Sequence, residues 1–173
     1  AKPELKEFFS FYCPHCNAFE PILHEIVQKL PAGSAFKKYH VDFMGQAPQP
    51  IQQSLSEVMV LAKLKGKDES VNKALFKHIH TDKKKFNSAE EIKAVAIAAG
   101  LDAATFDKDI KSFSVQSQVR LMQREQKTLS EAKIMNSVPT LIVNGRYKLH
   151  VDKLDEADIK GDLAALIQYL LTK

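Results

Sequence analysis

Apolar and polar positions alternate along the chain in a pattern that predicts an ordered series of strands and helices. The aromatic run from Phe8 to Tyr12 predicts a buried strand, and apolar residues recurring at three- and four-residue steps after it predict an amphipathic helix. Pro31 and Gly33 stop that helix, and Phe36 to Phe43 reads as a second strand. Strand, helix and strand in this order predict a right-handed parallel βαβ unit. The apolar face of the helix consists of Phe19, Ile22, Leu23, Ile26, Val27 and Leu30.

The C-terminal part of the chain predicts a hairpin followed by a helix. Leu141 to Val143 and Arg146 to Leu149 read as strands, and the Asn144-Gly145 pair between them is the strongest short hairpin signal. A helix is predicted from Ala157 to Thr172. The order βαβ followed by ββα is typical of the thioredoxin fold. The buried side of the last helix is expected to carry Leu163, Leu166, Ile167, Leu170 and Leu171.

Between these two parts the pattern is helical throughout, which predicts an inserted unit. Ser88 and Glu91 form a capping box ahead of one helix, and Gly100 stops it. Asp102 is expected to cap the next helix, whose apolar positions include Phe113. Met59, Met122 and the phenylalanines of this region are expected to be core residues. The fold class is therefore α/β, a thioredoxin fold with an inserted α-helical domain. We expect the thioredoxin-like domain to comprise residues 1–46 and 126–173, and the inserted helical domain to comprise residues 47–125.

Cys13 and Cys16 are the two cysteines of the chain, and three kinds of site compete for such a CxxC pair. A structural zinc site normally needs a second pair of ligands, and neither a second CxxC nor an HxxxH follows among the scattered histidines. A structural disulfide gains stability from the loop it closes, and this loop is very short. A redox pair beside a βαβ unit is typical of thioredoxin-like proteins, so we expect no metal here.

The redox interpretation gives each residue of the motif a separate role. Pro14 suits the first helical position, which leaves Cys13 at the N-cap, where helix N–H groups favour its thiolate. Cys13 is therefore the predicted nucleophile. Cys16, one turn along the same face, is the predicted resolving thiol. His15 is either an additional stabiliser of the thiolate or a solvated bystander.

Three charged residues are candidate modulators of the cysteine pair. Glu7 precedes the aromatic run and lies either at an exposed strand edge or buried beneath the disulfide. If it is buried, its ionisation is disfavoured and it could exchange a proton with Cys16. Lys38 on the neighbouring strand could pair with Glu7. Glu20 could also modulate the pair, although a charge on an amphipathic helix is commonly part of its solvated face.

Composition bounds the function without identifying it. The chain has 173 residues, 45% of them hydrophobic, and a net charge of +4. It has no apolar stretch long enough to span a bilayer, and we expect a soluble, compact protein. The run Lys83 to Lys85 is expected to be a solvated loop, because no aromatic or groove-reading motif accompanies it to suggest nucleic-acid binding.

The sequence resembles the DsbA family of bacterial periplasmic thiol oxidases. The resemblance is carried by the segment FFSFYCPHC with Glu7 before it, by KYHVDFMG, which begins at Lys38, and by VPTLIVNGRY, which contains Val138 and Pro139. CPHC is that family's signature. The resemblance implies a cis Val138–Pro139 bond that faces the disulfide, and it makes these two residues candidates for substrate binding. It further implies that Cys13 and Cys16 form a redox-active disulfide, with no other cofactor.

The resemblance implies an oxidase that donates its disulfide to exported, newly translocated proteins with free thiols. It also implies reoxidation by the membrane quinone-linked partner DsbB, and a mature periplasmic form whose signal peptide has been removed. We expect a monomer. Two alternatives remain: a thioredoxin-like reductase or isomerase, and a peptide-binding or chaperone module with an incidental disulfide. The family also has a further strand before the aromatic one, whereas only Ala1 to Lys6 precede Glu7 here, and an uncovered sheet edge would favour association with another chain.

Overall fold

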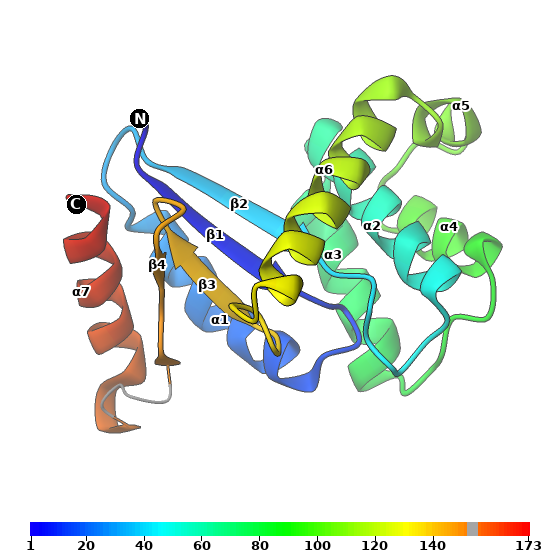
Figure 1. Ribbon diagram of the computed structural model, residues 1–173. Helices are drawn as coiled ribbons and strands as arrows, with labels where there is room; N and C mark the ends of the chain where they lie inside the picture. The colour runs from blue at the N-terminus through cyan, green and yellow to red at the C-terminus, as the bar shows by residue number, and fades with distance from the viewer. Residues whose placement is uncertain (152–155) are drawn as a thin grey trace.

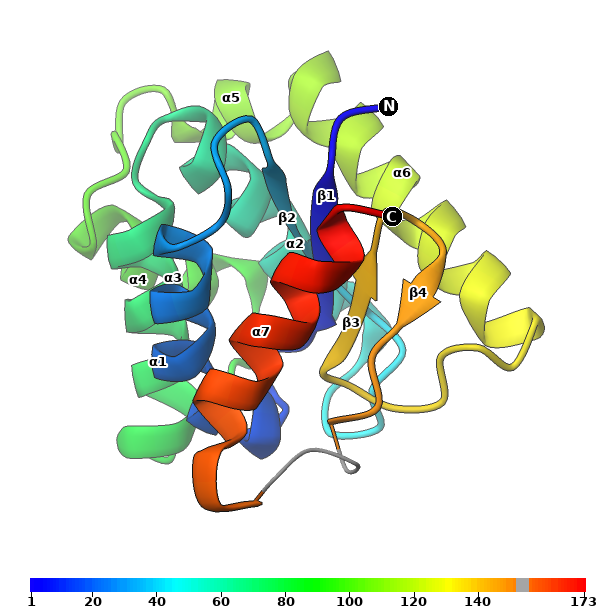
Figure 2. The ribbon, with the colours of Figure 1, turned by 90° about the vertical axis from the view of Figure 1, so that its left-hand side faces the viewer.

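The computed structural model describes residues 1–151 and 156–173 (Figure 1). Within these residues, a four-stranded sheet has the strand order β2-β1-β3-β4. Helices α1 and α7 pack together on one face of the sheet, and helices α2 to α5 form a group beyond β2 (Figures 1 and 2). Helix α6 runs from that group across the opposite face of the sheet, where Lys6 bonds to Glu125. The order of the elements confirms the predicted α/β thioredoxin fold with its inserted helices. The division at residues 46 and 126 stays a prediction, and α6 runs across the second of these positions.

The βαβ unit consists of β1 (Glu4–Phe9), α1 (Pro14–Gln28) and β2 (Ala35–His40). The two strands are parallel, with Glu7 opposite Lys38. Strand β1 starts at Glu4, before the predicted aromatic run, and ends at Phe9 because the chain turns between Ser10 and Cys13. Strand β2 forms one edge of the sheet and ends at His40, three residues before the predicted end. Beyond it, the N–H of Asp42 bonds to Gln126 of α6 instead of to a strand.

The hairpin and the last helix follow the prediction closely. Strand β3 (Thr140–Val143) is antiparallel to β1 and pairs with β4 (Tyr147–Lys148). Asn144 and Gly145 both have positive φ angles, of 53° and 63°, as a type I′ turn requires. Helix α7 (Ile159–Leu171) starts two residues later than predicted, after the short 3₁₀ helix η3 (Glu156–Asp158).

The inserted region contains five α-helices and one π-helical turn, called η1. Ser88 caps α4 as predicted, since its hydroxyl accepts a hydrogen bond from the Glu91 N–H. Asp102 does not cap the next helix, because its carboxylate accepts from Ala104 instead. Phe113 belongs to α6, where it is 80% exposed, so its predicted core position was wrong. The bounds are α2 (Gln49–Leu64), α3 (Asp68–Phe76), η1 (Lys77–Thr81), α4 (Ala89–Ala98), α5 (Phe106–Ile110) and α6 (Phe113–Glu131).

The buried apolar side chains form two clusters. The sheet-face cluster lies between the sheet and helices α1 and α7, and the larger central cluster joins the sheet to the inserted helices. Both cysteines belong to the central cluster. The sheet-face cluster consists of Leu5, Leu23, Ile26, Leu141, Val143, Leu149, Leu163, Ile167 and Leu171. The central cluster includes Phe8, Phe9, Phe11, Cys13, Cys16, Leu55, Met59, Phe76, Phe86 and Met122.

Candidate active site

Cys13 lies at the N-cap of α1, as Pro14 predicted. The N–H of Cys13 donates to the Ser10 carbonyl at 3.1 Å, which closes a tight turn between β1 and the helix. The Cys13 sulfur then accepts a hydrogen bond from the Cys16 N–H at 3.1 Å. The sulfur of an N-cap cysteine thus takes the place that a serine or aspartate oxygen usually occupies, next to the positive end of the helix dipole.

The two thiols have opposite acidities. The pKa of Cys13 is lowered to about 6, first by a hydrogen bond from the Cys16 thiol and then, against the effect of burial, by the N–H groups of Cys16 and His15 and the charge of His15. The pKa of Cys16 is raised, because its proton is held by Cys13, its side chain is fully buried, and the charges of Cys13 and Glu7 oppose ionisation. Both cysteines are free thiols in the structure. Because Cys13 has the lower pKa of the two, it is the thiol that ionises first.

Glu7, Lys38 and Glu20 form a charged triad on β1, β2 and α1. The Lys38 ammonium lies 2.6 Å from Glu7 Oε1 and also donates to Glu20. Glu7 is completely buried, which decides against the exposed-edge alternative, and its Oε2 atom has no hydrogen-bond partner among residues 1–151 and 156–173. Burial raises the pKa of Glu7 to about 7, although Lys38 opposes that shift. A carboxyl with this pKa can gain or lose a proton near neutral pH.

Val138 and Pro139 precede β3, and Val138 contacts Cys13. The peptide bond between them is cis, as the resemblance implied. When it is protonated, the Cys13 thiol donates to the Val138 carbonyl at a sulfur–oxygen distance of 3.5 Å. These residues precede β3, so the antiparallel pairing of β3 with β1 brings them from far along the sequence to the cysteine turn.

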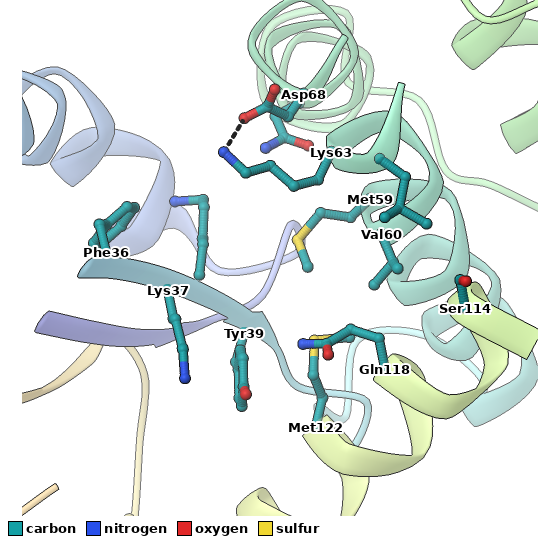
Figure 3. Close-up of a pocket in the computed structure, with 13 residues that line it drawn as sticks. Phe36, Lys37, Tyr39, Met59, Val60, Lys63, Asp68, Ser114, Gln118 and Met122 are labelled. Atoms are coloured by element: carbon teal, nitrogen blue, oxygen red, sulfur yellow. Dashed lines mark hydrogen bonds and ion pairs between the residues drawn. The ribbon is translucent and has the colours of Figure 1, made fainter. Parts of the chain in front are cut away.

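A separate groove of about 290 Å³ runs between the free edge of β2 and helices α2 and α6 (Figure 3). Tyr39, Met59 and Met122 point into it from three elements. Its lining includes Lys38 but neither cysteine, nor Val138 or Pro139. The groove therefore meets the active site only through the lysine of the charged triad.

Residues 1–151 and 156–173 contain no group of three or more His, Cys, Asp or Glu side chains arranged to hold a metal ion. No helix among them is long and apolar enough to cross a membrane.

Sequence reasoning missed two polar residues at the cysteine turn. Ser10 is completely buried and bonds to the N–H of Tyr12, and a lone polar residue within an aromatic run is a signal that could have found it. His80 bonds to the carbonyl of Phe11 across 69 positions of sequence. No local pattern could have identified that contact.

Comparisons with known proteins agree on one family. The family model of the DSBA-like thioredoxin domain matches residues 4–163. The thiol:disulfide interchange protein DsbA of Pectobacterium carotovorum is 33% identical, with 99% of this chain and 82% of that protein aligned, and its Haemophilus influenzae counterpart is 34% identical, with 98% and 80% aligned. The crystal structure of Proteus mirabilis DsbA superposes with a TM-score of 0.85 at 29% identity, covering 98% of this chain and 88% of that chain.

A second Proteus mirabilis structure shows a relative with a bound peptide. It is a cysteine-to-serine variant of DsbA with the non-covalently bound peptide PWATCDS, and it superposes with a TM-score of 0.84 at 30% identity, covering 99% of this chain and 90% of that chain. Fold, site and relatives together define a protein thiol:disulfide oxidoreductase with a thioredoxin fold. The chain belongs to the DsbA family.

Proposed function

We propose that Cys13 and Cys16 form the redox-active disulfide of a thiol oxidase, and that no other cofactor takes part. A substrate thiolate attacks the Cys13 sulfur, a mixed disulfide forms, and Cys16 leaves with the electron pair of the broken bond and takes up a proton. A second substrate thiolate then attacks the substrate sulfur of the mixed disulfide, and Cys13 leaves as a thiolate. The substrate has lost two electrons, which remain on the protein as the reduced cysteine pair.

The low pKa of Cys13 is the observation that supports the direction of transfer. A folded-state pKa below the ordinary value of 9.0 stabilises the reduced protein as a thiolate, and this stabilisation is present at high pH and lost as pH falls through about 6. Stabilising the reduced form makes the disulfide a stronger oxidant. The lowered Cys13 pKa therefore supports electron flow from substrate thiols to the protein.

We assign the proton transfers at Cys16 to Glu7. The charge of Glu7 is among the causes that raise the pKa of Cys16, and its own pKa of about 7 lets it act as acid or base. Lys38 and Glu20 set the ionisation of Glu7, since the lysine charge lowers its pKa and the glutamate charge raises it. Lys38 stays charged, because its two carboxylate partners outweigh the effect of burial on its pKa.

Substrates are expected to bind as extended segments against Val138 and Pro139. The contact of the Val138 carbonyl with Cys13 supports this assignment, as does the peptide bound to the Proteus mirabilis relative. We propose unfolded or partly folded exported proteins as substrates and the periplasm as the location. Reoxidation by a membrane quinone-linked DsbB and a monomeric state complete the proposal, and both rest on the family.

The proposal is tested by titrating the thiolate absorbance of the reduced protein and by measuring its equilibrium with glutathione. We expect a midpoint near pH 6 and an equilibrium in favour of the reduced protein. A Cys13 pKa near that of a free thiol, about 8.5, would contradict the oxidase and favour a peptide-binding module. A low pKa together with a weakly oxidising disulfide would favour a reductase or isomerase.

A further inference from the structure

The turn between β1 and α1 ends at Cys13, and one of its peptide groups has two possible orientations. The hydrogen bond from Cys13 N–H to Ser10 O makes Phe11 and Tyr12 the central residues of a four-residue turn. In such a turn, the peptide group between the central residues has no partner within the backbone of the turn, and type I and type II turns differ by a flip of that group. Its polar atoms here are the Phe11 carbonyl and the Tyr12 N–H.

Both polar atoms of this peptide are held by side chains. The Tyr12 N–H donates to Ser10 Oγ at 3.1 Å, and His80 Nε2 lies 2.6 Å from the Phe11 carbonyl oxygen. A carbonyl only accepts, so Nε2 of His80 carries the proton of this bond. Phe11 is completely buried and Tyr12 is 6% exposed, so a flipped peptide would leave both groups without water to replace the lost partners.

His80 belongs to the inserted helical region. It lies in the π-helical turn η1, and such turns are frequent at functional sites. A second bond joins the inserted region to the turn, because the Phe86 N–H, five residues beyond η1, donates to the Tyr12 hydroxyl at 3.4 Å. The inserted region is therefore attached to the two residues that precede Cys13.

We propose that His80 and Ser10 are positioning residues for disulfide exchange, which fix the Phe11–Tyr12 peptide and so hold the Cys13 sulfur over the N–H groups at the start of α1. The inference rests on the proposed role of Cys13 as the nucleophile. Cys13 directly follows the fixed peptide, and its backbone angles of −85° and 115° aim its sulfur at the Cys16 N–H. A rotation at Tyr12 would move the sulfur away from these donors.

The test compares His80→Leu, which removes the donor, with His80→Gln, whose amide N–H can replace it. Thiolate titration and the rate of exchange with a cysteine-containing peptide are measured for both variants. We expect His80→Leu to raise the Cys13 pKa by about 0.5 to 1 unit and to slow exchange roughly three- to tenfold, the loss that corresponds to one neutral hydrogen bond. His80→Gln should restore most of both quantities.

Thr81→Val is the matched control. Thr81 directly follows His80 in the same π-helical turn, and its side chain is exposed. We expect the Cys13 pKa of this variant to match that of the wild type. If His80→Leu does not fold, Ser10→Ala removes the partner at the other end of the peptide and should shift the pKa in the same direction.

Two outcomes would overturn the inference. One is a His80→Leu protein that unfolds more easily while its Cys13 pKa and exchange rate stay at the wild-type values, because His80 would then be only structural. The other is equal loss in His80→Gln and His80→Leu. The thiolate titration of the wild-type protein tests the proposed function separately from the role of His80. A wild-type Cys13 pKa near that of a free thiol would overturn the proposed function, whereas a low wild-type pKa that His80→Leu leaves unchanged would overturn only the role of His80.

Discussion

The two apolar clusters of the molecule differ in what surrounds their side chains. The sheet-face cluster is covered by α1 and α7, and among the described residues neither helix contributes a buried polar or charged side chain. The central cluster contains both cysteines and adjoins the buried His40, whose ring contacts Phe9 and Phe11. Glu7 and Ser10 are buried in the same strand and turn.

The sheet-face cluster therefore contributes mainly to stability, whereas the central cluster also surrounds the reactive cysteines. An apolar cluster gains free energy from each side chain that it removes from water, whereas a buried ionisable group costs free energy unless it is paired or neutral. In the central part of the fold, the buried ionisable side chains of Glu7 and His40 lie close to the segment that carries Cys13 and Cys16. Buried polar groups that depart from apolar packing are expected at functional sites. Substitutions in the two clusters should therefore affect different measurements.

The largest expected effect is the loss of activity on replacing the cysteines of the central cluster. Cys13→Ala should abolish oxidation of a dithiol peptide, because the redox disulfide cannot form and no sulfur is left for the substrate thiolate to attack. Cys16→Ala should instead accumulate mixed disulfides, visible on non-reducing gels, when its Cys13 thiolate attacks a disulfide-bonded substrate peptide, because Cys16 is no longer there to displace the bound sulfur. Equal loss without trapping in either variant would contradict the assigned roles.

Leu163→Ala should lower the stability of the fold and leave the chemistry of the cysteines unchanged. Leu163 is completely buried in the sheet-face cluster, so its truncation should lower the free energy of unfolding by about 2 to 5 kcal/mol. Denaturant unfolding measures this loss. The Cys13 pKa of the folded variant should not change, and a shifted thiol titration would show that the two clusters are not independent.

A smaller effect on stability is expected from the pH dependence of His40. Burial lowers its pKa from 6.5 to about 3. Its Nδ1 atom bonds to Ser56 Oγ at 2.7 Å, and its Nε2 atom has no partner in the described part of the chain. The unfolded chain then binds more protons between these pH values, so stability falls as pH decreases through this range, by up to about 1.4 kcal/mol per pH unit. Unfolding of the oxidised protein should show this slope, and His40→Phe should remove it.

The control for that slope is His24→Phe, since His24 is exposed on α1. Its pH dependence should equal that of the wild type. A slope that persists in His40→Phe would assign the acid sensitivity to other groups.

The sequence predicted the parts of this site that depend on local rules. Pro14 placed Cys13 at the N-cap, and the pairing of parallel strands placed Lys38 beside Glu7. It did not predict that β1 ends at Phe9, because aromatic residues favour a strand, whereas here the side chains of Ser10 and His80 bond the backbone of a buried turn. The bond from His80 to Phe11 has no local signature for the same reason.

Glu7→Gln tests whether the buried carboxyl takes part in exchange. The variant keeps the size of the side chain and removes the group whose pKa is raised to about 7. The reduction of the oxidised protein by a thiol peptide should slow about tenfold at neutral pH, because Cys16 then leaves without a nearby acid. The rate profile should also lose its step near pH 7, and a profile that keeps this step would assign it to another group.

His15→Ala should have the smallest effect of the series. His15 acts through its backbone N–H, which the variant keeps, and through its charge, which the variant removes. We expect the Cys13 pKa to rise by about half a unit and the glutathione equilibrium to shift about threefold toward the disulfide form. His24→Ala changes a histidine further along the same helix and should leave both quantities unchanged. An unchanged Cys13 pKa in His15→Ala would mean that the helix N–H groups and the Cys16 thiol stabilise the thiolate alone, and that His15 is a solvated bystander.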